Sequence, residues 1–292
     1  MWPQGISLGP VSFSGYGLAI VAAVFSALYY LNRMAPRAGV SPKQALDLGF
    51  WLIVVGLLGA RATYVAFHPT VFARSPLNVI KYWEGGLMFQ GGLIAGLILV
   101  AVLAILGRVR FLSMSDALAP ALALGQAVGR LGCLLAGCCY GRPAPLGFPL
   151  ALTFPLGAQA PVGLPLYPTQ IAESLGLFLI TLYLTRLLSS PTLPVRLGLI
   201  ARPTHPARLD PTSGLGPQHP PRPAGLILAA YLALAGLLRF AVDLFRGDFR
   251  GPKVLGLAPT SWAALAIFLT GLILTLRLLA NRGHAPNKKT PT

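Results

Sequence analysis

Seven long apolar stretches constrain this chain more than any other feature of its sequence. Each has the length of about 20 mostly apolar residues that a helix needs to cross a bilayer. They cover residues 13–32, 45–67, 86–106, 114–136, 168–188, 224–245 and 257–280. Only 10% of the residues are charged, against about 25% in an ordinary soluble domain. The sequence therefore predicts an all-α, polytopic membrane protein with seven transmembrane helices and excludes a water-soluble globule.

The positions of lysine and arginine predict how these helices are oriented. Of the 23 basic residues, fourteen follow spans on one side, six lie on the other side and three lie within spans. Because cytoplasmic loops carry the excess of Lys and Arg, we expect the N-terminus outside and the C-terminus in the cytoplasm. This bias also accounts for most of the formal net charge of +16, so no nucleic-acid partner is expected.

The first apolar stretch is expected to remain as a helix, because residues 1–12 contain no Lys or Arg and no small-residue cleavage site follows it. We expect one integral membrane domain over residues 1–292. Residues 189–223 contain nine prolines, which predicts a disordered cytoplasmic loop. Residues 143–167 are rich in Pro and Gly yet apolar, and are expected to form an extracytoplasmic loop on the membrane surface. Residues 283–292 would form a cytoplasmic tail.

Ionisable side chains inside the spans mark candidate sites, because each costs about 2.5–3.5 kcal/mol to insert. Arg239 and Asp243 are four residues apart and share a helix face. They could form a self-neutralising structural pair or part of a site. Arg130 follows Gln126 by one turn and has no acid near it in sequence. It could pair with Glu173 or Asp243, or bind an anionic ligand, since a guanidinium donates two parallel hydrogen bonds to phosphate.

Other polar residues fall near the ends of the spans that are expected to face outward. They include Tyr16, Gln90 and Gln170. Gly137 and Gly141 follow the fourth span, where glycine allows either tight helix packing or close approach of the backbone to a ligand. We expect the first, third, fourth, fifth and sixth spans to meet around an outward-facing cavity. Its positive charge would suit a phospholipid headgroup.

Three cysteines, Cys133, Cys138 and Cys139, lie at the end of the fourth span. Their C-x4-C-C spacing is not a standard zinc spacing, and no histidine lies near them in sequence. The spacing therefore predicts no metal site, and nothing in the sequence predicts a cofactor. Apolar packing, a disulfide, or a nucleophilic or redox role for Cys133 or Cys138 all remain open.

Several motifs together resemble the bacterial prolipoprotein diacylglyceryl transferase family. The signature-like part is Gly129-Arg130-Leu131-Gly132, followed by Gly137 and Gly141-Arg142. The other pieces, in chain order, are Ile6-Ser7-Leu8-Gly9-Pro10 with Tyr16-Gly17, Gly59-Ala60-Arg61, Gly85-Gly86-Leu87-Met88-Phe89-Gln90-Gly91-Gly92, Tyr167-Pro168-Thr169-Gln170 with Glu173, and Arg239-Phe240 with Asp243. The order matches the family over nearly the whole chain.

The resemblance implies an enzyme of the bacterial cytoplasmic (inner) membrane that needs no cofactor. It would take the diacylglyceryl group from phosphatidylglycerol, or another anionic phospholipid, and attach it to the cysteine thiol of a lipoprotein-precursor peptide. Glycerol phosphate would be released. The family also has seven helices with the N-terminus outside, in agreement with the orientation expected from charge.

The resemblance further implies roles for individual residues. Arg130 would hold the phosphate. The other residues expected at the phospholipid are Gln126, Gln170, Glu173, Gly137 and Gly141. Arg239 would neutralise the departing phosphate, with Asp243, where the family has Glu, orienting it. Tyr16 and Gln90 complete the expected catalytic set. The family has a histidine in place of Gln90, a candidate to activate the thiol.

The chain also departs from the family signature at three further positions. Cys133 and Ala136 replace asparagines, and Cys138 replaces a glutamate. These changes keep two other hypotheses open. One has the same phospholipid donor with a different acceptor, with Cys133 or Cys138 as a covalent intermediate. The other is a non-catalytic lipid-binding membrane protein. A transporter is disfavoured, because no inverted repeat is visible.

Overall fold

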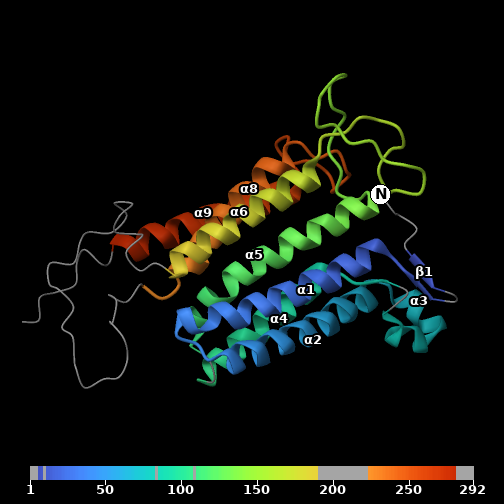
Figure 1. Ribbon diagram of the computed structural model, residues 1–292. Coiled ribbons are helices and arrows are strands. Elements are labelled where there is room, and N and C mark those ends of the chain that lie inside the picture. Colours follow the sequence, from blue (N-terminus) through green and yellow to red (C-terminus); the bar gives the residue numbers. More distant parts are fainter. Residues whose placement is uncertain (1–5, 9–10, 83–84, 108–109, 190–222, 281–292) are drawn as a thin grey trace, which may run out of the picture.

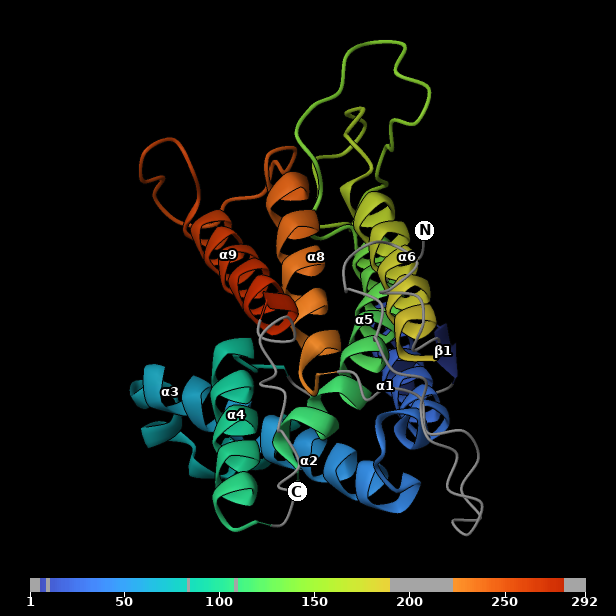
Figure 2. The ribbon, with the colours of Figure 1, turned by 90° about the vertical axis from the view of Figure 1, so that its left-hand side faces the viewer.

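The computed structural model describes residues 6–8, 11–82, 85–107, 110–189 and 223–280 as a bundle of long helices (Figures 1 and 2). The long helices are α1 (Gly15–Met34), α2 (Pro42–Phe67), α4 (Phe89–Ile105), α5 (Phe111–Ala136), α6 (Thr169–Ser189), α8 (Leu226–Asp243) and α9 (Pro259–Ala280). Each helix begins and ends within three residues of a predicted span. The prediction of a helical membrane protein is therefore confirmed, while most of the predicted 189–223 loop and the whole 283–292 tail lie outside the described residues.

Shorter elements connect the long helices. Strands β1 (Ile6–Leu8) and β2 (Val11–Phe13) form an antiparallel hairpin before α1, with Ile6 opposite Phe13. A 3-10 turn, η1 (Ala35–Ala38), follows α1, while α3 (Pro69–Arg74) and η2 (Pro76–Ile80) follow α2. The described fold is helical as predicted, and this short hairpin before the first span is an addition that was not predicted from the sequence.

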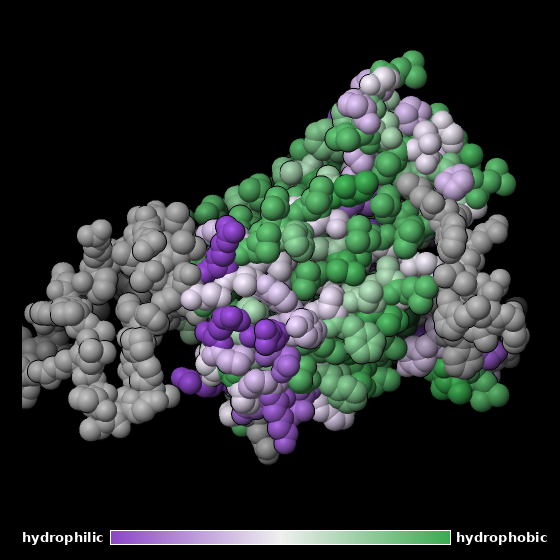
Figure 3. Space-filling model, viewed as in Figure 1, coloured by the Kyte–Doolittle hydropathy of each residue, from purple (hydrophilic) through white to green (hydrophobic). Residues whose placement is uncertain are grey.

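The exposed surface of the bundle is that of a multi-pass membrane protein. Among the described residues, six helices are long and apolar enough to cross a membrane. The seventh apolar helix, α4, has 17 residues, so its length is about 26 Å against a hydrocarbon core of about 30 Å. Large apolar side chains such as Phe25 and Leu97 are well exposed. In Figure 3 apolar side chains cover the helices, and hydrophilic ones gather where α1 ends and α2 begins.

The helices run alternately up and down, so their connections gather at two ends of the bundle. We call one of these the loop end: there α2, α5 and α8 finish, and α1, α4, α6 and α9 begin. The β-hairpin, the long α5–α6 connection and the α8–α9 connection all lie at the loop end (Figure 1). Every polar residue singled out near a span end therefore comes to this end of the molecule.

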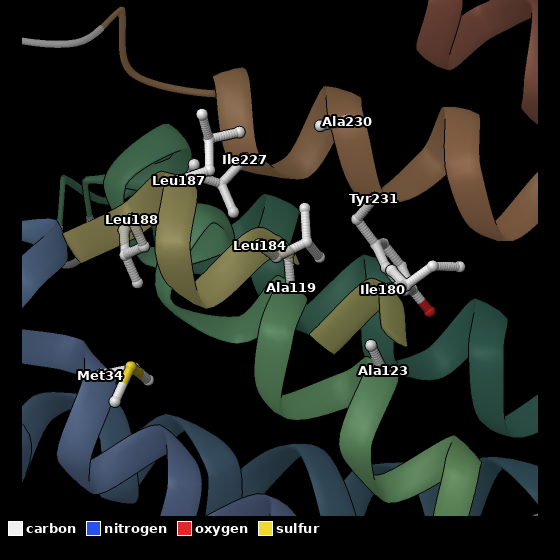
Figure 4. Packing of buried hydrophobic residues seen from close by; sticks show 10 residues of the cluster. All are labelled: Met34, Ala119, Ala123, Ile180, Leu184, Leu187, Leu188, Ile227, Ala230 and Tyr231. Carbon is white, nitrogen blue, oxygen red and sulfur yellow. The ribbon is translucent and has the colours of Figure 1, made fainter. Parts of the chain in front are cut away.

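A core cluster joins α5, α6 and α8 and fixes their relative positions (Figure 4). Small side chains of α5 face leucine and isoleucine side chains of α6 and α8, which lets the three helices approach closely. The buried members are Met34, Ala119, Ala123, Ile180, Leu184, Leu187, Leu188, Ile227, Ala230 and Tyr231. The three helices that carry Arg130, Glu173 and Arg239 are thus held together by apolar packing.

The buried carboxylate of Asp116 ties α5 to the start of α8. Its Oδ2 accepts a hydrogen bond from the Gly225 N–H at 2.8 Å, and its Oδ1 accepts one from the Leu228 N–H at 2.9 Å. The first N–H groups of a helix have no partner within the helix. A negative charge there also interacts favourably with the positive end of the helix dipole. Asp116 therefore fixes where α8 begins relative to α5.

Candidate active site

A continuous chain of ion pairs crosses α5, α6 and α8 near the loop end. Glu173 Oε1 lies 3.0 Å from Arg130 Nη2 and 3.0 Å from Arg239 Nη1. Arg239 Nε lies 3.2 Å from Asp243 Oδ1, one turn further along α8. Asp243 Oδ2 in turn lies 2.6 Å from Arg250 Nη1. The Arg239–Asp243 pair is thus present, and Arg130 pairs with Glu173, which was one of the partners left open by the sequence.

The acids of this chain are buried and the two span arginines are partly exposed. The side chains of Glu173 and Asp243 are 7% and 0% exposed, against 24% for Arg130 and 25% for Arg239. A buried carboxylate is tolerable only when it is paired and hydrogen-bonded, and here the arginines meet that need. Their exposed edges leave guanidinium N–H groups available to an anion.

The α8–α9 connection extends the cluster with side chains that the sequence analysis did not assign to the site. Arg246 Nη2 lies 2.6 Å from Asp248 Oδ2, and Arg250 donates to Thr260 Oγ1 at 2.8 Å. Arg246, Asp248 and Arg250 line a cavity of about 310 Å³ together with Lys253. The ion-paired groups are four arginines and three carboxylates, which leave one net positive charge, and Lys253 adds a second. The site therefore favours an anionic ligand.

Two glycines shape the chain as it leaves α5. Gly137 ends the helix in the left-handed conformation, with φ +69°, and a Cβ there would lie 2.6 Å from Ala158 Cβ. A Cβ on Gly141 would lie 2.3 Å from the Tyr167 carbonyl oxygen. Both positions therefore require glycine for the loop to close against 154–167. The structure gives Gly137 and Gly141 a role in backbone packing, where the sequence analysis placed them at the phospholipid.

The reversal at Gly137 brings all three cysteines together beside Arg130. Their Sγ atoms all lie within 4.8 Å of one another, and all three are free thiols. Arg130 Nη1 lies 3.7 Å from Cys139 Sγ and 3.9 Å from Cys133 Sγ. Hydrogen bonds from the Cys133 and Cys138 thiols, and then the charges of Arg246 and Arg130, lower the pKa of the Cys139 thiol. Hydrogen bonding to Cys133 and Cys139 raises the pKa of the Cys138 thiol.

Two of the amides predicted at the phospholipid make hydrogen bonds within the protein. Gln170 is buried and its Nε2 donates to the Cys138 carbonyl oxygen at 2.9 Å. Its neighbour Thr169 donates to the Cys139 carbonyl oxygen at 3.0 Å. Gln126 Nε2 donates to the Tyr231 hydroxyl at 2.7 Å. Gln170 therefore positions the cysteine loop, and Gln126 joins α5 to α8.

Tyr16 and Gln90 lie in different surroundings. Tyr16 is exposed in the first turn of α1 and lies beside Gly132 of α5. Gln90 is exposed at the start of α4, and α4 packs against α2. In both views α2 and α4 lie at the opposite edge of the bundle from α8 and α9 (Figures 1 and 2). The expectation that five spans meet around one cavity is thus corrected for α4, which packs on α2, while α5 packs against α1, α6 and α8.

Arg61, the third basic residue within a span, is an anchor for the segment that leads into α4. It is buried in α2 and donates to backbone carbonyl oxygens at both ends of that segment. The distances are 2.9 Å to Val79, 3.0 Å to Gly86 and 3.2 Å to Lys81. This guanidinium is saturated by carbonyl oxygens, which fits a structural role.

Comparison with known proteins supplies the family. A family profile described as "Prolipoprotein diacylglyceryl transferase" matches residues 3–200. The chain belongs to the prolipoprotein diacylglyceryl transferase family. It is 32% identical over 279 residues to the phosphatidylglycerol–prolipoprotein diacylglyceryl transferase of Bordetella avium, covering 93% of this chain and 92% of that protein. The protein of the same name from Geobacter sulfurreducens is 29% identical over 289 residues, covering 96% and 95%.

Membership of the prolipoprotein diacylglyceryl transferase family gives the departures from its signature a structural meaning. Two of them, Cys133 and Cys138, belong to the thiol cluster beside Arg130. The signal for the third thiol, Cys139, was missed: a spacing of three residues, about one helical turn, links Cys133 to Arg130, whereas Cys139 reaches Arg130 only through the turn at Gly137. Arg246 was missed for a similar reason, because it approaches from the α8–α9 connection, far away in sequence.

Proposed function

We propose that this chain is a diacylglyceryl transferase that moves the diacylglyceryl group of phosphatidylglycerol to the cysteine thiol of a lipoprotein precursor. The reaction would take place at the outer face of the bacterial cytoplasmic membrane. In this proposal the protein has seven spans, with α4 as the short third one, its N-terminus outside and its C-terminus in the cytoplasm. The loop end then faces outward, and the anionic headgroup enters the site from the outer leaflet.

One observation carries the proposal: Arg130 and Arg239 flank the same buried glutamate while keeping about a quarter of each side chain exposed. Glu173 holds the two guanidinium groups close together on neighbouring helices. A phosphodiester that reaches their exposed edges receives hydrogen bonds from two fixed cations in a partly desolvated place. Arg130 holds the phosphate, and Arg239, oriented by Asp243, faces the charge that develops on it.

The transfer step exchanges one bond for another. The acceptor thiolate attacks the diacylglyceryl carbon that carries the phosphate ester. A C–S bond forms as the C–O bond breaks, and glycerol phosphate leaves with the electron pair. Donors that are already in place stabilise that developing charge without reorganisation. The acceptor proton passes to solvent before attack, since a cysteine thiol is a few per cent ionised at neutral pH.

The test is turnover by purified protein in micelles, with phosphatidylglycerol and a peptide that carries a lipoprotein-type cysteine. Mass spectrometry would detect the diacylglyceryl thioether and the released glycerol phosphate. Arg130→Ala should abolish the product. Arg130→Lys should keep the charge and the fold yet lose most turnover, because lysine lacks the two-pronged donor geometry. The control is Arg186→Ala, which removes an exposed arginine at the other end of α6 and should leave turnover unchanged.

Two outcomes would replace the proposal. Retention of phosphatidylglycerol by wild type, lost in Arg130→Ala, with no thioether formed, would indicate a lipid-binding protein without turnover. Release of glycerol phosphate without modification of the peptide would indicate another acceptor. Equal turnover by wild type, Arg130→Ala and Arg130→Lys would contradict the role given to the arginine pair.

A further inference from the structure

Cys133, Cys138 and Cys139 are the only cysteines of the chain, and the fold brings all three to one place. Cys133 is buried in the last turn of α5, and the other two are partly buried in the loop that follows. No metal was predicted here from the sequence, because C-x4-C-C does not match the usual spacing of zinc ligands. The turn at the end of α5 brings the three thiols together, which their sequence spacing does not indicate.

The distances suit a thiolate-bound metal ion. A zinc–sulfur bond is about 2.3 Å, so sulfurs around a tetrahedral ion lie about 3.8 Å apart. The three Sγ atoms lie within 4.8 Å of one another, so rotation of the side chains closes the remaining distance. The backbone beneath them is held firmly. Cys138 N donates to the Cys133 carbonyl at 3.1 Å, and Gln170 and Thr169 hold the carbonyls of Cys138 and Cys139.

The charges around the cluster also suit a divalent ion. The four arginines and three carboxylates of the site leave one positive charge. A divalent cation bound by three thiolates carries one negative charge, which these cations stabilise, and Lys253 leaves the site with positive charge for an anion. Arg130 lies within 4 Å of two of the sulfurs, and Arg246 contacts Cys139. Such neighbours stabilise metal-bound thiolates and orient them.

We propose that Cys133, Cys138 and Cys139 bind one soft divalent cation of the zinc type, and that its fourth coordination position takes the acceptor thiol. Three protein ligands with one open position are the arrangement of catalytic zinc sites. A thiol that coordinates such an ion loses its proton, which here passes to solvent. The ion would then supply the activation that Gln90, an uncharged amide exposed at the start of α4, does not supply. This role rests on the proposed transferase function, whereas the metal site itself does not.

Cadmium titration of the reduced, full-length protein in micelles tests the site without any turnover. Because the chain has no other cysteine, the cadmium–thiolate absorption band reports this cluster alone. We expect one equivalent of Cd²⁺ to bind, and Cd²⁺ to displace Zn²⁺ from protein loaded with Zn²⁺ first, because soft thiolates favour the softer ion. Each of Cys133→Ser, Cys138→Ser and Cys139→Ser should weaken binding by about tenfold or more. The control, His68→Ala, removes a possible metal ligand on another element and should bind as wild type does.

Two results would overturn the metal site. One is three reactive thiols that bind no Cd²⁺ or Zn²⁺ at stoichiometric concentration. The other is a disulfide, detected by mass spectrometry as the state of these cysteines in protein taken directly from membranes. Either would assign the cluster to packing or to redox chemistry instead.

The role of the ion is tested separately in the transfer assay. Chelation should abolish thioether formation and Zn²⁺ should restore it, while phosphatidylglycerol binding is unchanged. Transfer that continues in chelated protein and in Cys139→Ser would contradict the metal role and leave the transferase function standing. Zinc bound by a protein that transfers nothing in any state would contradict the transferase function and leave the metal site standing.

Discussion

Replacing Glu173 by glutamine tests the centre of the ion-pair chain. The substitution Glu173→Gln keeps the size of the side chain and one carbonyl oxygen but removes the charge that Arg130 and Arg239 share. Breaking a buried ion pair costs about 3–5 kcal/mol. Because both arginines are about a quarter exposed, water solvates them in part, and we expect a loss of about 3 kcal/mol, at the lower end of that range.

A double-mutant cycle isolates the part of this loss that belongs to the pair. The free energy of unfolding in micelles would be measured for wild type, Arg130→Ala, Glu173→Gln and the double variant. A charge-assisted hydrogen bond contributes about 1.5–3 kcal/mol. The loss of stability in the double variant should therefore be smaller than the sum of the two single losses, and the difference should be about 1.5–3 kcal/mol. Additivity within about 0.5 kcal/mol would refute the reasoning. The control is Asp47→Asn, which neutralises an exposed acid on α2.

The same variant also separates structural from functional roles of Glu173. Neutralising it leaves two guanidinium groups without their shared counter-charge, so an anionic headgroup should bind more tightly even though the protein is less stable. Measuring retention of phosphatidylglycerol against a zwitterionic phospholipid would show this. Weaker retention of phosphatidylglycerol by a folded Glu173→Gln protein would indicate that the glutamate itself contacts the lipid.

Three further predictions follow from individual contacts. Asp116→Asn should lower the free energy of unfolding by about 1–2 kcal/mol, measured by thermal unfolding, because it removes the charge at the start of α8. Gly141→Ala should cost about 1–3 kcal/mol, because its Cβ overlaps the Tyr167 backbone, whereas Gly56→Ala, whose Cβ would make only an ordinary contact with the Gly92 carbonyl oxygen at 3.8 Å, should be tolerated. In metal-free protein below pH about 8.5, the ordinary thiol pKa, iodoacetamide should label Cys139 faster than Cys138. The lowered pKa of Cys139 keeps it as the reactive thiolate, whereas the raised pKa of Cys138 keeps it protonated. Equal labelling rates would contradict that assignment.

The helices could be predicted from the sequence because a membrane imposes one simple requirement on each of them. Length and apolarity decide where a span lies, and all seven stretches became helices within three residues of the expected ends. The same rule says nothing about which spans touch. Five were expected around the cavity, but Gly59, Gly91 and Gly92 let α2 and α4 pack closely, and α4 carries Gln90 away from the arginines.

Within the site, local sequence spacing predicted the ion pair within one helix and left open the ion pairs between helices. Arg239 and Asp243 share a face of α8, so their pairing follows from a separation of four residues. The partner of Arg130 could not be chosen from the sequence, because Glu173 and Asp243 both lie on other helices and local spacing does not distinguish between them. Only the packing of α5 against α6 and α8 decides in favour of Glu173.

The loop that leaves α5 determines how the arginines and the thiols lie relative to one another. Arg142 N donates to the Phe245 carbonyl at 2.8 Å, and Gly247 N donates to the Tyr140 carbonyl at 3.0 Å. The cysteine loop is thereby fastened to the end of α8, where Arg246 begins the next connection. Because Arg130 contacts both Glu173 and Cys139, a phosphate held by this arginine and a thiol held at the cluster lie within reach of one guanidinium. Reactants placed that close, on a backbone fixed by hydrogen bonds, need little further ordering before they react. One short segment, residues 130–141, thus carries the arginine proposed to bind the phosphate, both required glycines and all three cysteines.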